Sequence, residues 1–350
     1  MITAWDGRNS RSNDGEMIMQ YQERSIQVWL VSLCAAIAVL SGCCGAGDSR
    51  TNRLTKSGNS EVVCCATADT LLELIGQAAS LLHAAANVLD SSFIANISKE
   101  AAALPRSGPK PADTSFLQPL LRKVFDEWKI AFMPHNSSIG ASVPQQVYKK
   151  KQGACLGIAL LMLLVAEKNG YPLHGVVIPG HFFVRYDDGT TRRNIEPNAS
   201  GIERSDEYYR ERYGITPESW YYPLRNLSKK EAAAVFYFML GNDARLKGQW
   251  REARVCYETS LRLFPRYPDA LGNLSLVFAE RKNIDVALAL LDSVARIDPA
   301  NPKVYRNTAL FLLKKKRFAE AGAIARKMRI CGDSIGAMEL DLLISQGSRQ

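Results

Sequence analysis

Apolar residues follow two periods along the chain, and each period predicts a different kind of structure. In the C-terminal third they lie on helical faces, and the whole pattern repeats every 34 residues over 234–335. Such a repeat predicts helix pairs that stack and bury the apolar faces of their neighbours. The recurring positions are Ala253, Ala287 and Ala321, then Trp250, Ile284 and Phe318, then Pro265 and Pro299, and finally Pro268 and Pro302.

The first copy of this repeat resembles the tetratricopeptide pattern, in which small residues let paired helices approach and a proline ends the second helix. Ser228 and Glu231 have the spacing of a capping box, which starts the array at about Ser228. We expect three repeats in residues 228–350, with a closing helix at 336–346. Such arrays bind peptides in a concave groove or buttress a neighbouring domain, and the sequence leaves both roles open. The matching residues are Tyr237, Leu240, Gly241, Gly248, Trp250, Ala253, Tyr257 and Pro265.

An apolar stretch in the middle of the chain, residues 155–169, predicts a helix that is buried on nearly all sides and closes at Asn169-Gly170. Cys155 opens this helix. The first turn of a helix has unpaired backbone N–H groups and the positive end of the helix dipole, and both favour a negatively charged sulfur. The position therefore suits a nucleophile, and a small cysteine that packs the helix start is the structural alternative.

The following segment changes to the patterning of β-strands, with runs at 175–178 and 181–186. Asp188-Gly189 predicts a two-residue turn, after which residues 191–196 return antiparallel. In that register His181 lies directly opposite Glu196 on the same face, with the Cβ atoms roughly 5 Å apart. At this separation a carboxylate can hold an imidazole in one tautomer.

Cys155, His181 and Glu196 together supply a nucleophile, a base and an orienting acid, which is the logic of the catalytic triad applied to cysteine. His181 would take the Cys155 proton, the sulfur would attack a carbonyl carbon, and the Cys155 N–H would stabilise the oxyanion. Gln146 or Gln152 would supply a second donor. If the three residues serve packing instead, the domain is a non-catalytic platform.

Several segments of this region, together with the apolar helix, resemble the transglutaminase-like superfamily in the bacterial branch that carries tetratricopeptide repeats downstream. The likeness covers roughly Ser115 to the end of the chain. It implies a papain-like fold with Cys155 as nucleophile and His181 as base, in a superfamily that includes cross-linking transferases and peptidases. The third member is usually Asp, so Glu196 departs from the pattern, with Asn198 as a substitute orienter; some members lose the Cys and keep the fold. The segments are Gly-Ala-Cys-Leu-Gly at 153–157, Leu-His-Gly-Val at 173–176, Pro-Gly-His-Phe-Phe-Val-Arg at 179–185 and Asn-Ile-Glu-Pro at 194–197.

The N-terminal part has the pattern of an export signal. Residues 26–40 form an apolar run that is short for a transmembrane helix and ends in small residues. Leu40-Ser41-Gly42-Cys43 resembles the bacterial lipobox, in which Cys43 would carry the lipid. We therefore expect residues 1–43 to be a signal peptide with a lipobox and residues 44–60 a flexible tether, with an uncleaved anchor as the alternative.

Composition and charge narrow the classes of protein. The chain has 350 residues, of which 47% are hydrophobic and 23% charged, and this composition is typical of a folded protein. It excludes a disordered tail, a collagen-like repeat and a polytopic membrane protein. Residues 225–350 hold 22 Lys and Arg against 13 Asp and Glu, so they account for the whole net charge of +9. Spread over helices, these charges indicate a solvated surface, and nucleic acid is an unlikely partner. The cysteine spacing fits no metal site, and no cofactor is expected.

Three further expectations concern packing. Residues 67–97 and 115–132 have the apolar stripes of two lead-in helices. Cys256 and Cys331 fall on apolar helical faces and should be buried thiols. The aromatic cluster after the hairpin should pack between domains, with a substrate groove as the alternative. This cluster comprises Tyr208, Tyr209, Tyr213, Trp220, Tyr221 and Tyr222.

The sequence thus predicts a papain/transglutaminase-like α+β domain within residues 61–224, followed by an all-α tetratricopeptide solenoid. The predicted function is that of a cysteine hydrolase or acyltransferase on amide bonds of a peptide-like substrate. Its location would be outside the cytoplasm, on a membrane through the lipid anchor, and its repeats would hold a peptide or protein ligand. The alternative is a scaffold in which only the repeats bind.

Overall fold

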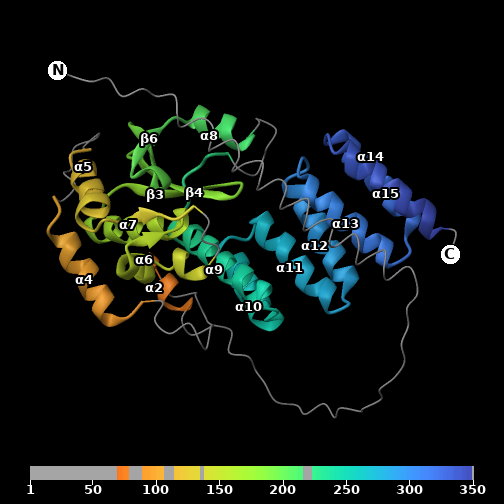
Figure 1. Cartoon of the computed structure of the whole chain (residues 1–350), viewed down its shortest axis with the longest axis horizontal. Coiled ribbons are helices and arrows are strands. Elements are labelled where there is room, and N and C mark those ends of the chain that lie inside the picture. The colour runs from red at the N-terminus through yellow and green to blue at the C-terminus, as the bar shows by residue number, and fades with distance from the viewer. Residues whose placement is uncertain (1–68, 79–88, 106–113, 135–137, 216–222, 349–350) are drawn as a thin grey trace, which may run out of the picture.

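The computed structural model describes residues 69–78, 89–105, 114–134, 138–215 and 223–348 (Figure 1). The apolar run at 26–40, the predicted lipidation site Cys43 and the tether lie outside these ranges. No helix among the described residues is long and apolar enough to cross a membrane.

Helix α7, Cys155–Asn169, is the axis of the first domain. Its side chains are buried from Leu156 to Ala166, as the unbroken apolar run predicted. Gly170 ends it in the left-handed conformation at φ +69°, which glycine adopts without the steric penalty of a side chain. The core around α7 includes residues of α4, α6 and α2 and of the sheet (Figure 1). The bounds of these helices are Ser91–Ala102 for α4, Pro144–Lys150 for α6 and Leu71–Gly76 for α2.

A four-stranded antiparallel sheet packs against α7 in the order β3-β4-β5-β6. One face, with Phe182, Val184 and Tyr186, shares the α7 core, while Phe183 on the other face packs with Tyr209 of α8. Both faces of β4 are therefore buried, which explains its nearly continuous apolar sequence. The bounds are Leu173–Ile178 for β3, His181–Asp187 for β4, Arg192–Glu196 for β5, Ile202–Arg204 for β6 and Asp206–Tyr213 for α8.

The predicted register of the β4–β5 hairpin is wrong by two residues. Asp187 pairs with Arg192, so the turn contains four residues and not two. The Asp188 carboxylate explains the wider turn, because its Oδ1 accepts the N–H groups of Thr190 at 2.9 Å and Thr191 at 2.7 Å. Since an even shift leaves every side chain on its original face, the two site residues remain on one face but are diagonal neighbours.

The segment before α7 also differs from the prediction. The helix expected at 67–97 is not continuous, because Asp90 is extended and caps α4 by accepting the Phe93 N–H at 2.7 Å. The helix expected at 115–132 ends at Glu127. Its elements are α5, Leu117–Leu121, and the π-helix η2, Arg122–Glu127. Strand β1, Ala131–Phe132, follows and pairs in parallel with β2, Gln152–Gly153. The 3₁₀-helix η3, Ile139–Ser142, lies between these two strands in the sequence.

Seven helices form the C-terminal array, as the 34-residue period predicted. Ser228 and Glu231 make the predicted capping box at the start of α9, and Pro268 and Pro302 open α11 and α13. Asp333 stands where the series of Pro265 and Pro299 would place a third proline, and it caps the closing helix by accepting the Gly336 N–H at 3.2 Å. The helices are α9, Lys229–Leu246; α10, Trp250–Leu263; α11, Pro268–Glu280; α12, Ile284–Ile297; α13, Pro302–Lys314; α14, Phe318–Ile330; and α15, Ser334–Gly347.

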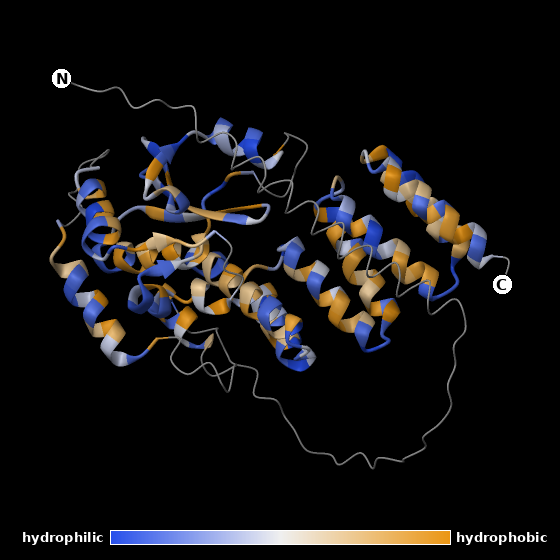
Figure 2. Cartoon of the chain, in the orientation of Figure 1, coloured by the Kyte–Doolittle hydropathy of each residue, from blue (hydrophilic) through white to orange (hydrophobic). Residues whose placement is uncertain are grey.

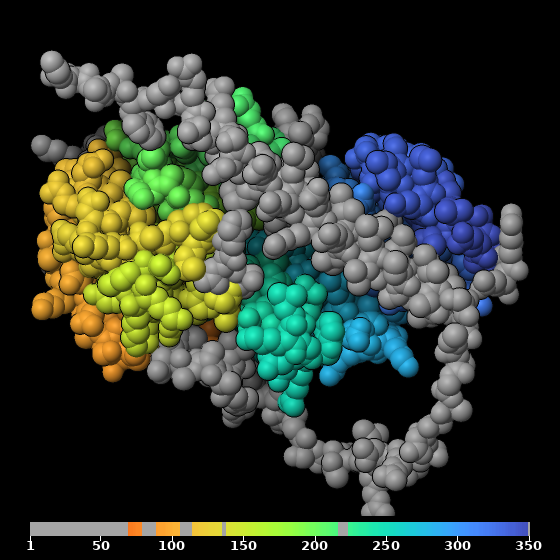
Figure 3. All heavy atoms as spheres, viewed as in Figure 1, coloured from red at the N-terminus to blue at the C-terminus, as the bar shows by residue number. Residues whose placement is uncertain are grey.

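The first helix pair of the array is built into the first domain. The α7 core continues through α9 and α10 as far as Ala270, whereas the later repeats form a separate core. Tyr237 on α9 donates to the Leu74 carbonyl at 2.9 Å, and Lys229 pairs with Glu167 of α7 at 2.7 Å. Figure 2 shows that apolar and hydrophilic positions are interspersed along the helices of both parts. In Figure 3, α9 and α10 lie directly against the first domain. The first repeat therefore buttresses the domain.

The start of α7 tolerates no side chain at Gly157. A Cβ atom there would lie 2.2 Å from the Ala141 carbonyl oxygen, which also accepts the Ala154 N–H at 2.8 Å. We expect Gly157→Ala to lower the free energy of unfolding by about 1–3 kcal/mol, as overpacking of a core does. The matched control is Gly322→Ala in α14, where a Cβ meets nothing within 4 Å and should stabilise by up to about 1 kcal/mol. Urea denaturation measures the free energy of unfolding of both variants. Equal changes for Gly157→Ala and Gly322→Ala would contradict the close approach of the Ala141 carbonyl to Gly157.

Candidate active site

Cys155 is the first residue of α7, as predicted. Ala154 before it is extended and provides no side-chain cap, so the N-terminus of the helix is open. Within the described part of the chain, the Cys155 N–H makes no hydrogen bond. The Cys155 side chain is half-buried, while the residues that follow it are buried. The helix therefore presents a thiol beside a free backbone donor.

His181 begins β4, directly after the turn at Gly180. Its side chain is buried, and its Nε2 lies 2.9 Å from Glu196 Oε2. The Cys155 side chain is the second group whose interaction raises the pKa of the imidazole. Because Glu196 occupies Nε2, Nδ1 is the ring nitrogen left for the sulfur. The structure thus brings together the three side chains that were named from the sequence. His181 and Glu196 are diagonal neighbours on β4 and β5, a separation that the longer side chain of Glu can span.

Glu196 is held by more donors than the sequence indicated. Its Oε2 also accepts the Tyr209 hydroxyl at 3.1 Å, and its Oε1 accepts the Asn198 backbone N–H at 2.9 Å. Burial raises the pKa of Glu196, but the His181 ring and these donors outweigh burial and leave that pKa below its ordinary value. Asn198 therefore acts on the site through its backbone; its side-chain Oδ1 is buried without a hydrogen-bond partner among the described residues.

The environment of His181 favours its protonated form. Burial lowers the pKa of the imidazole, but its interactions with Cys155 and Glu196 outweigh burial and raise it to about 9. At neutral pH the ring is then a cation between a carboxylate and a sulfur. Such a cation stabilises negative charge on the sulfur, which is the form in which a cysteine attacks.

Two tyrosines of α8 cover the imidazole, a feature that the sequence interpretation missed. The ring of Tyr213 stacks on His181 with centroids 5.2 Å apart and planes 4° apart, and Tyr209 lies at 6.2 Å. These residues were expected to pack between domains or to line a groove. Their four-residue spacing on a short helix was the available signal, because it places both on one face. Burial raises the pKa of both phenols, so Tyr209 remains a neutral donor to Glu196.

A buried arginine fixes α8 over the sheet. Arg185 is fully buried on β4; its Nε donates to Asn194 Oδ1 and its Nη2 to Asp206 Oδ1, both at 2.6 Å. It also donates to the Leu224 carbonyl oxygen. Because Asp206 opens α8 and Asn194 lies on β5, one guanidinium joins the strand of His181, the strand of Glu196 and the helix that covers them.

Neither glutamine proposed as a second oxyanion donor makes a hydrogen bond to the site in the described residues. Gln152 is exposed on β2, three residues before Cys155, and Gln146 is half-buried on α6. The buried amide of α6 is Gln145, whose Nε2 donates to Asp90 at 2.7 Å. The role of Gln146 or Gln152 as a donor stays a prediction.

The other two described cysteines belong to the array, Cys256 within α10 and Cys331 directly after α14. Cys256 is fully buried, as predicted, and burial raises the pKa of its thiol to about 12. Cys331 is only half-buried, contrary to the prediction, because it follows the last residue of α14; its sulfur lies 3.4 Å from the Pro299 carbonyl oxygen. Of the three described cysteines, Cys155 is the one that interacts with an imidazole.

Comparison with known proteins identifies both parts. Residues 90–214 match the family model of the transglutaminase-like superfamily, and residues 238–302 and 283–334 match that of the tetratricopeptide repeat. The chain carries a transglutaminase-like domain followed by tetratricopeptide repeats. The resemblance noted in the sequence, including the order of the two parts, is confirmed.

Two proteins of Xylella fastidiosa, both named UPF0162 protein, are similar to this chain in sequence. One, from strain Temecula1, is 27% identical over 181 residues, 49% of this chain and 62% of that protein. The other, from strain 9a5c, is 28% identical over 157 residues, 42% of this chain and 53% of that protein. The chain thus spans little more than half the length of these relatives.

One solved structure shows a similar fold over most of the chain. A crystal structure of menin is 14% identical, with a TM-score of 0.51, and the match covers 73% of this chain and 65% of menin. It therefore shares architecture across both the transglutaminase-like domain and the repeats. The TPR2B domain of yeast Sti1 is 21% identical with a TM-score of 0.32, covering 35% of this chain and 99% of that domain.

The ionised His181–Glu196 pair should make stability depend on pH. Because the pKa of His181 is raised, its contribution is complete below about 6.5 and is lost as the pH rises through about 9. The pKa of Glu196 is lowered, so its contribution is present above its ordinary value of 4.5 and is lost as the pH falls through its folded value. We expect Glu196→Gln to cost about 3 kcal/mol near pH 6 and clearly less near pH 10.

Denaturation of both proteins at the two pH values measures this difference. Glu203→Gln is the matched control, because Glu203 forms an exposed pair with Arg193 and its loss should cost less than about 1 kcal/mol at either pH. A cost for Glu196→Gln that does not change with pH would contradict an ionised pair.

Proposed function

We propose that Cys155, His181 and Glu196 are the catalytic residues of a thiol hydrolase or acyltransferase that acts on amide bonds of a peptide-like substrate. The observation that supports this most is the buried imidazole, which lies 2.9 Å from Glu196 through Nε2 and interacts with the Cys155 side chain at a helix N-terminus. The transglutaminase-like match over residues 90–214 supports the same chemistry.

The geometry supports a two-stage acyl transfer. The Cys155 thiolate attacks the amide carbonyl carbon, a C–S bond forms, and the oxyanion accepts the Cys155 N–H. His181, protonated at Nδ1, gives that proton to the amide nitrogen as the C–N bond breaks and the amine leaves. The neutral Nδ1 then removes a proton from water or from a second amine, which attacks the thioester and releases Cys155 as thiolate. Water completes hydrolysis, and an amine completes transfer.

A purely structural role for the three residues accounts less well for the site. Burying two charged groups costs several kcal/mol even when they are paired, and apolar residues of similar volume are often as stable. A scaffold would need neither this pair nor a thiol beside it. The repeats still suit a second role, and we propose that they hold a peptide or protein ligand.

We also propose that the protein is an exported lipoprotein anchored through Cys43. The apolar run at 26–40 and the sequence Leu40-Ser41-Gly42-Cys43 support this. In a bacterial host, Cys43→Ser should block cleavage of the signal and remove the lipid, which mass spectrometry of the recovered protein measures. A lipidated product of the Cys43→Ser variant would contradict the proposed anchor.

Thiol reactivity tests the proposed nucleophile. Iodoacetamide at about pH 7 should label Cys155 at least tenfold faster than Cys256, which is buried, and Cys331, the pKa of which burial raises. His181→Ala should slow the labelling of Cys155 at least tenfold and leave Cys331 unchanged. Peptide mass spectrometry measures each thiol separately, with Cys331 as the internal control. If Cys155 were labelled equally slowly in the unmodified chain and in His181→Ala, the catalytic role would be contradicted and the non-catalytic scaffold supported.

A further inference from the structure

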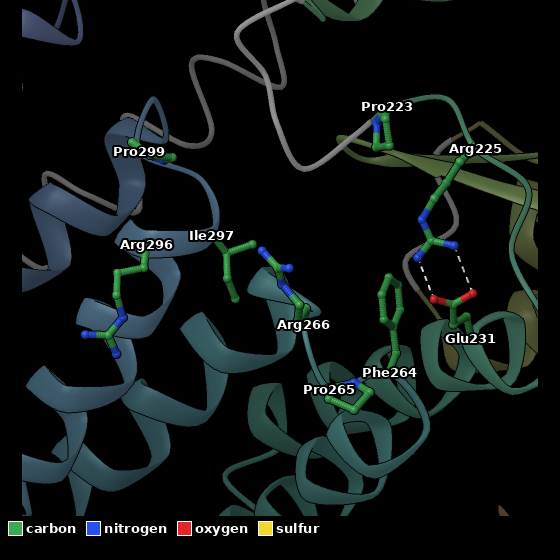
Figure 4. A pocket seen from close by; sticks show the side chains of 9 residues that line it. All are labelled: Pro223, Arg225, Glu231, Phe264, Pro265, Arg266, Arg296, Ile297 and Pro299. Carbon is green, nitrogen blue, oxygen red and sulfur yellow. Dashed lines mark hydrogen bonds and ion pairs between the residues drawn. The ribbon is translucent and has the colours of Figure 1, made fainter.

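A groove of about 830 Å³ opens along one edge of the array, where it meets the first domain (Figure 4). Three stretches line it: the segment before α9 with the first turn of that helix, the turn after α10, and the end of α12 with the turn after it. The groove therefore follows the ends of successive repeats, where second helices finish and first helices begin. Its lining residues are Pro223, Arg225, Glu231, Phe264, Pro265, Arg266, Arg296, Ile297 and Pro299.

The apolar part of the lining is rigid. Phe264 is buried and stacks on Tyr267 with centroids 5.2 Å apart, so its ring is fixed at the groove. Three prolines line the groove, and each has a fixed φ. Ile297 adds an aliphatic surface between Arg266 and Arg296 (Figure 4). An apolar side chain can be buried here at little cost in ordering the walls.

The charged part of the lining is positive. Arg225 is neutralised, because its Nη1 lies 3.0 Å from a Glu231 oxygen and its guanidinium lies over the Phe264 ring at 5.3 Å. Arg266 is exposed and has no ion pair or hydrogen bond within the described residues. Among the described residues, Arg296 forms an ion pair with Asp292 and donates to Ser293 Oγ at 3.2 Å, both on its own helix. The side chains of Arg296 and Asp292 are both more than 60% exposed, so their ion pair is weak. Two guanidinium groups are therefore available to a ligand.

We propose that this groove binds an acidic peptide, with an apolar side chain against Pro265 and Ile297 and carboxylates on Arg266 and Arg296. Guanidinium groups match carboxylates in a planar, two-bond geometry. The excess of 22 Lys and Arg over 13 Asp and Glu in residues 225–350 attracts such a peptide over a longer range. The proposal names the partner of the repeats and so rests on their proposed ligand-binding role; it does not depend on Cys155.

A peptide fits the lining better than a nucleic acid does. The Phe264 ring is covered by Arg225 and Tyr267 and so offers no free face on which a base could stack. The groove also adjoins the first domain, since Leu224, between two lining positions, packs with Phe183 and Tyr209. A peptide bound in this groove therefore lies close to Tyr209, which covers His181 of the candidate site.

Binding of a labelled peptide to the full chain tests the proposal. The probe is a fluorescein-labelled, end-capped peptide with alternating Glu and Leu, compared with the same peptide carrying Gln for Glu or Ser for Leu. We expect fluorescence anisotropy to show saturable binding of the Glu/Leu peptide, at least tenfold weaker binding of each altered peptide, and an affinity that falls as salt increases.

Charge reversal locates the site. Arg266→Glu should weaken the Glu/Leu peptide at least tenfold, and adding Arg296→Glu should weaken it further. Arg251→Glu is the matched control, because Arg251 is an exposed arginine of α10 outside the groove, and it should change the affinity less than twofold. Both groove arginines are exposed, so the variants should fold, which circular dichroism checks.

Three outcomes would overturn the proposal: no saturable binding of the Glu/Leu peptide, equal effects of Arg266→Glu and Arg251→Glu, or tighter, Arg266-dependent binding of a single-stranded oligonucleotide. Cys155→Ala should bind the peptide like the unmodified chain. A catalytic role that fails in the thiol test would therefore leave this result intact, and loss of peptide binding would not affect the labelling of Cys155.

Discussion

The buried pair of His181 and Glu196 is the interaction that most constrains the first domain. Two charged groups inside a protein are stable only when each polar atom has a partner, since an unpaired buried charge costs several kcal/mol. Here Nε2 of the imidazole and both carboxylate oxygens have hydrogen-bond partners, and the Cys155 side chain interacts with the ring. The partners come from the start of α7, the turn after β5 and the middle of α8, so one pair fixes the relative positions of three elements.

The elements around this pair are organised to hold it. Helix α7 places the thiol because Gly157 lets the backbone at Ala141 approach its first turn. Arg185 joins β4, β5 and α8, and so holds the tyrosines over the imidazole. The first helix pair of the repeats shares the α7 core, which makes it part of the domain that carries the site. The later repeats have their own core, and their edge provides the basic groove.

Local signals predicted the parts of this structure that local interactions determine. The start of α7 at Cys155 and the capping box at Ser228 depend on residues a few positions apart, and the 34-residue period reflects helix pairs that pack on their neighbours along the chain. The structure confirms all three. The face shared by His181 and Glu196 was also predictable, because alternation along a strand survives an even shift in register. The register itself was wrong, because the Asp188 carboxylate stabilises a four-residue turn through contacts that a two-residue turn signal does not include. The cover of Tyr209 and Tyr213, and the groove at Arg266, arise where segments distant in sequence meet. The four-residue spacing of the tyrosines predicts that they share a helix face, but not which residue that face covers.

The central claim is that His181 is a cation held between Glu196 and Cys155. Nitrogen-15 NMR of the imidazole across a pH titration of the full chain measures its charge directly. The account predicts both ring nitrogens protonated at about pH 7.5, with a midpoint near 9 that falls in the Glu196→Gln variant. A neutral ring at that pH, with a midpoint below about 6.5 in both proteins, would contradict the account.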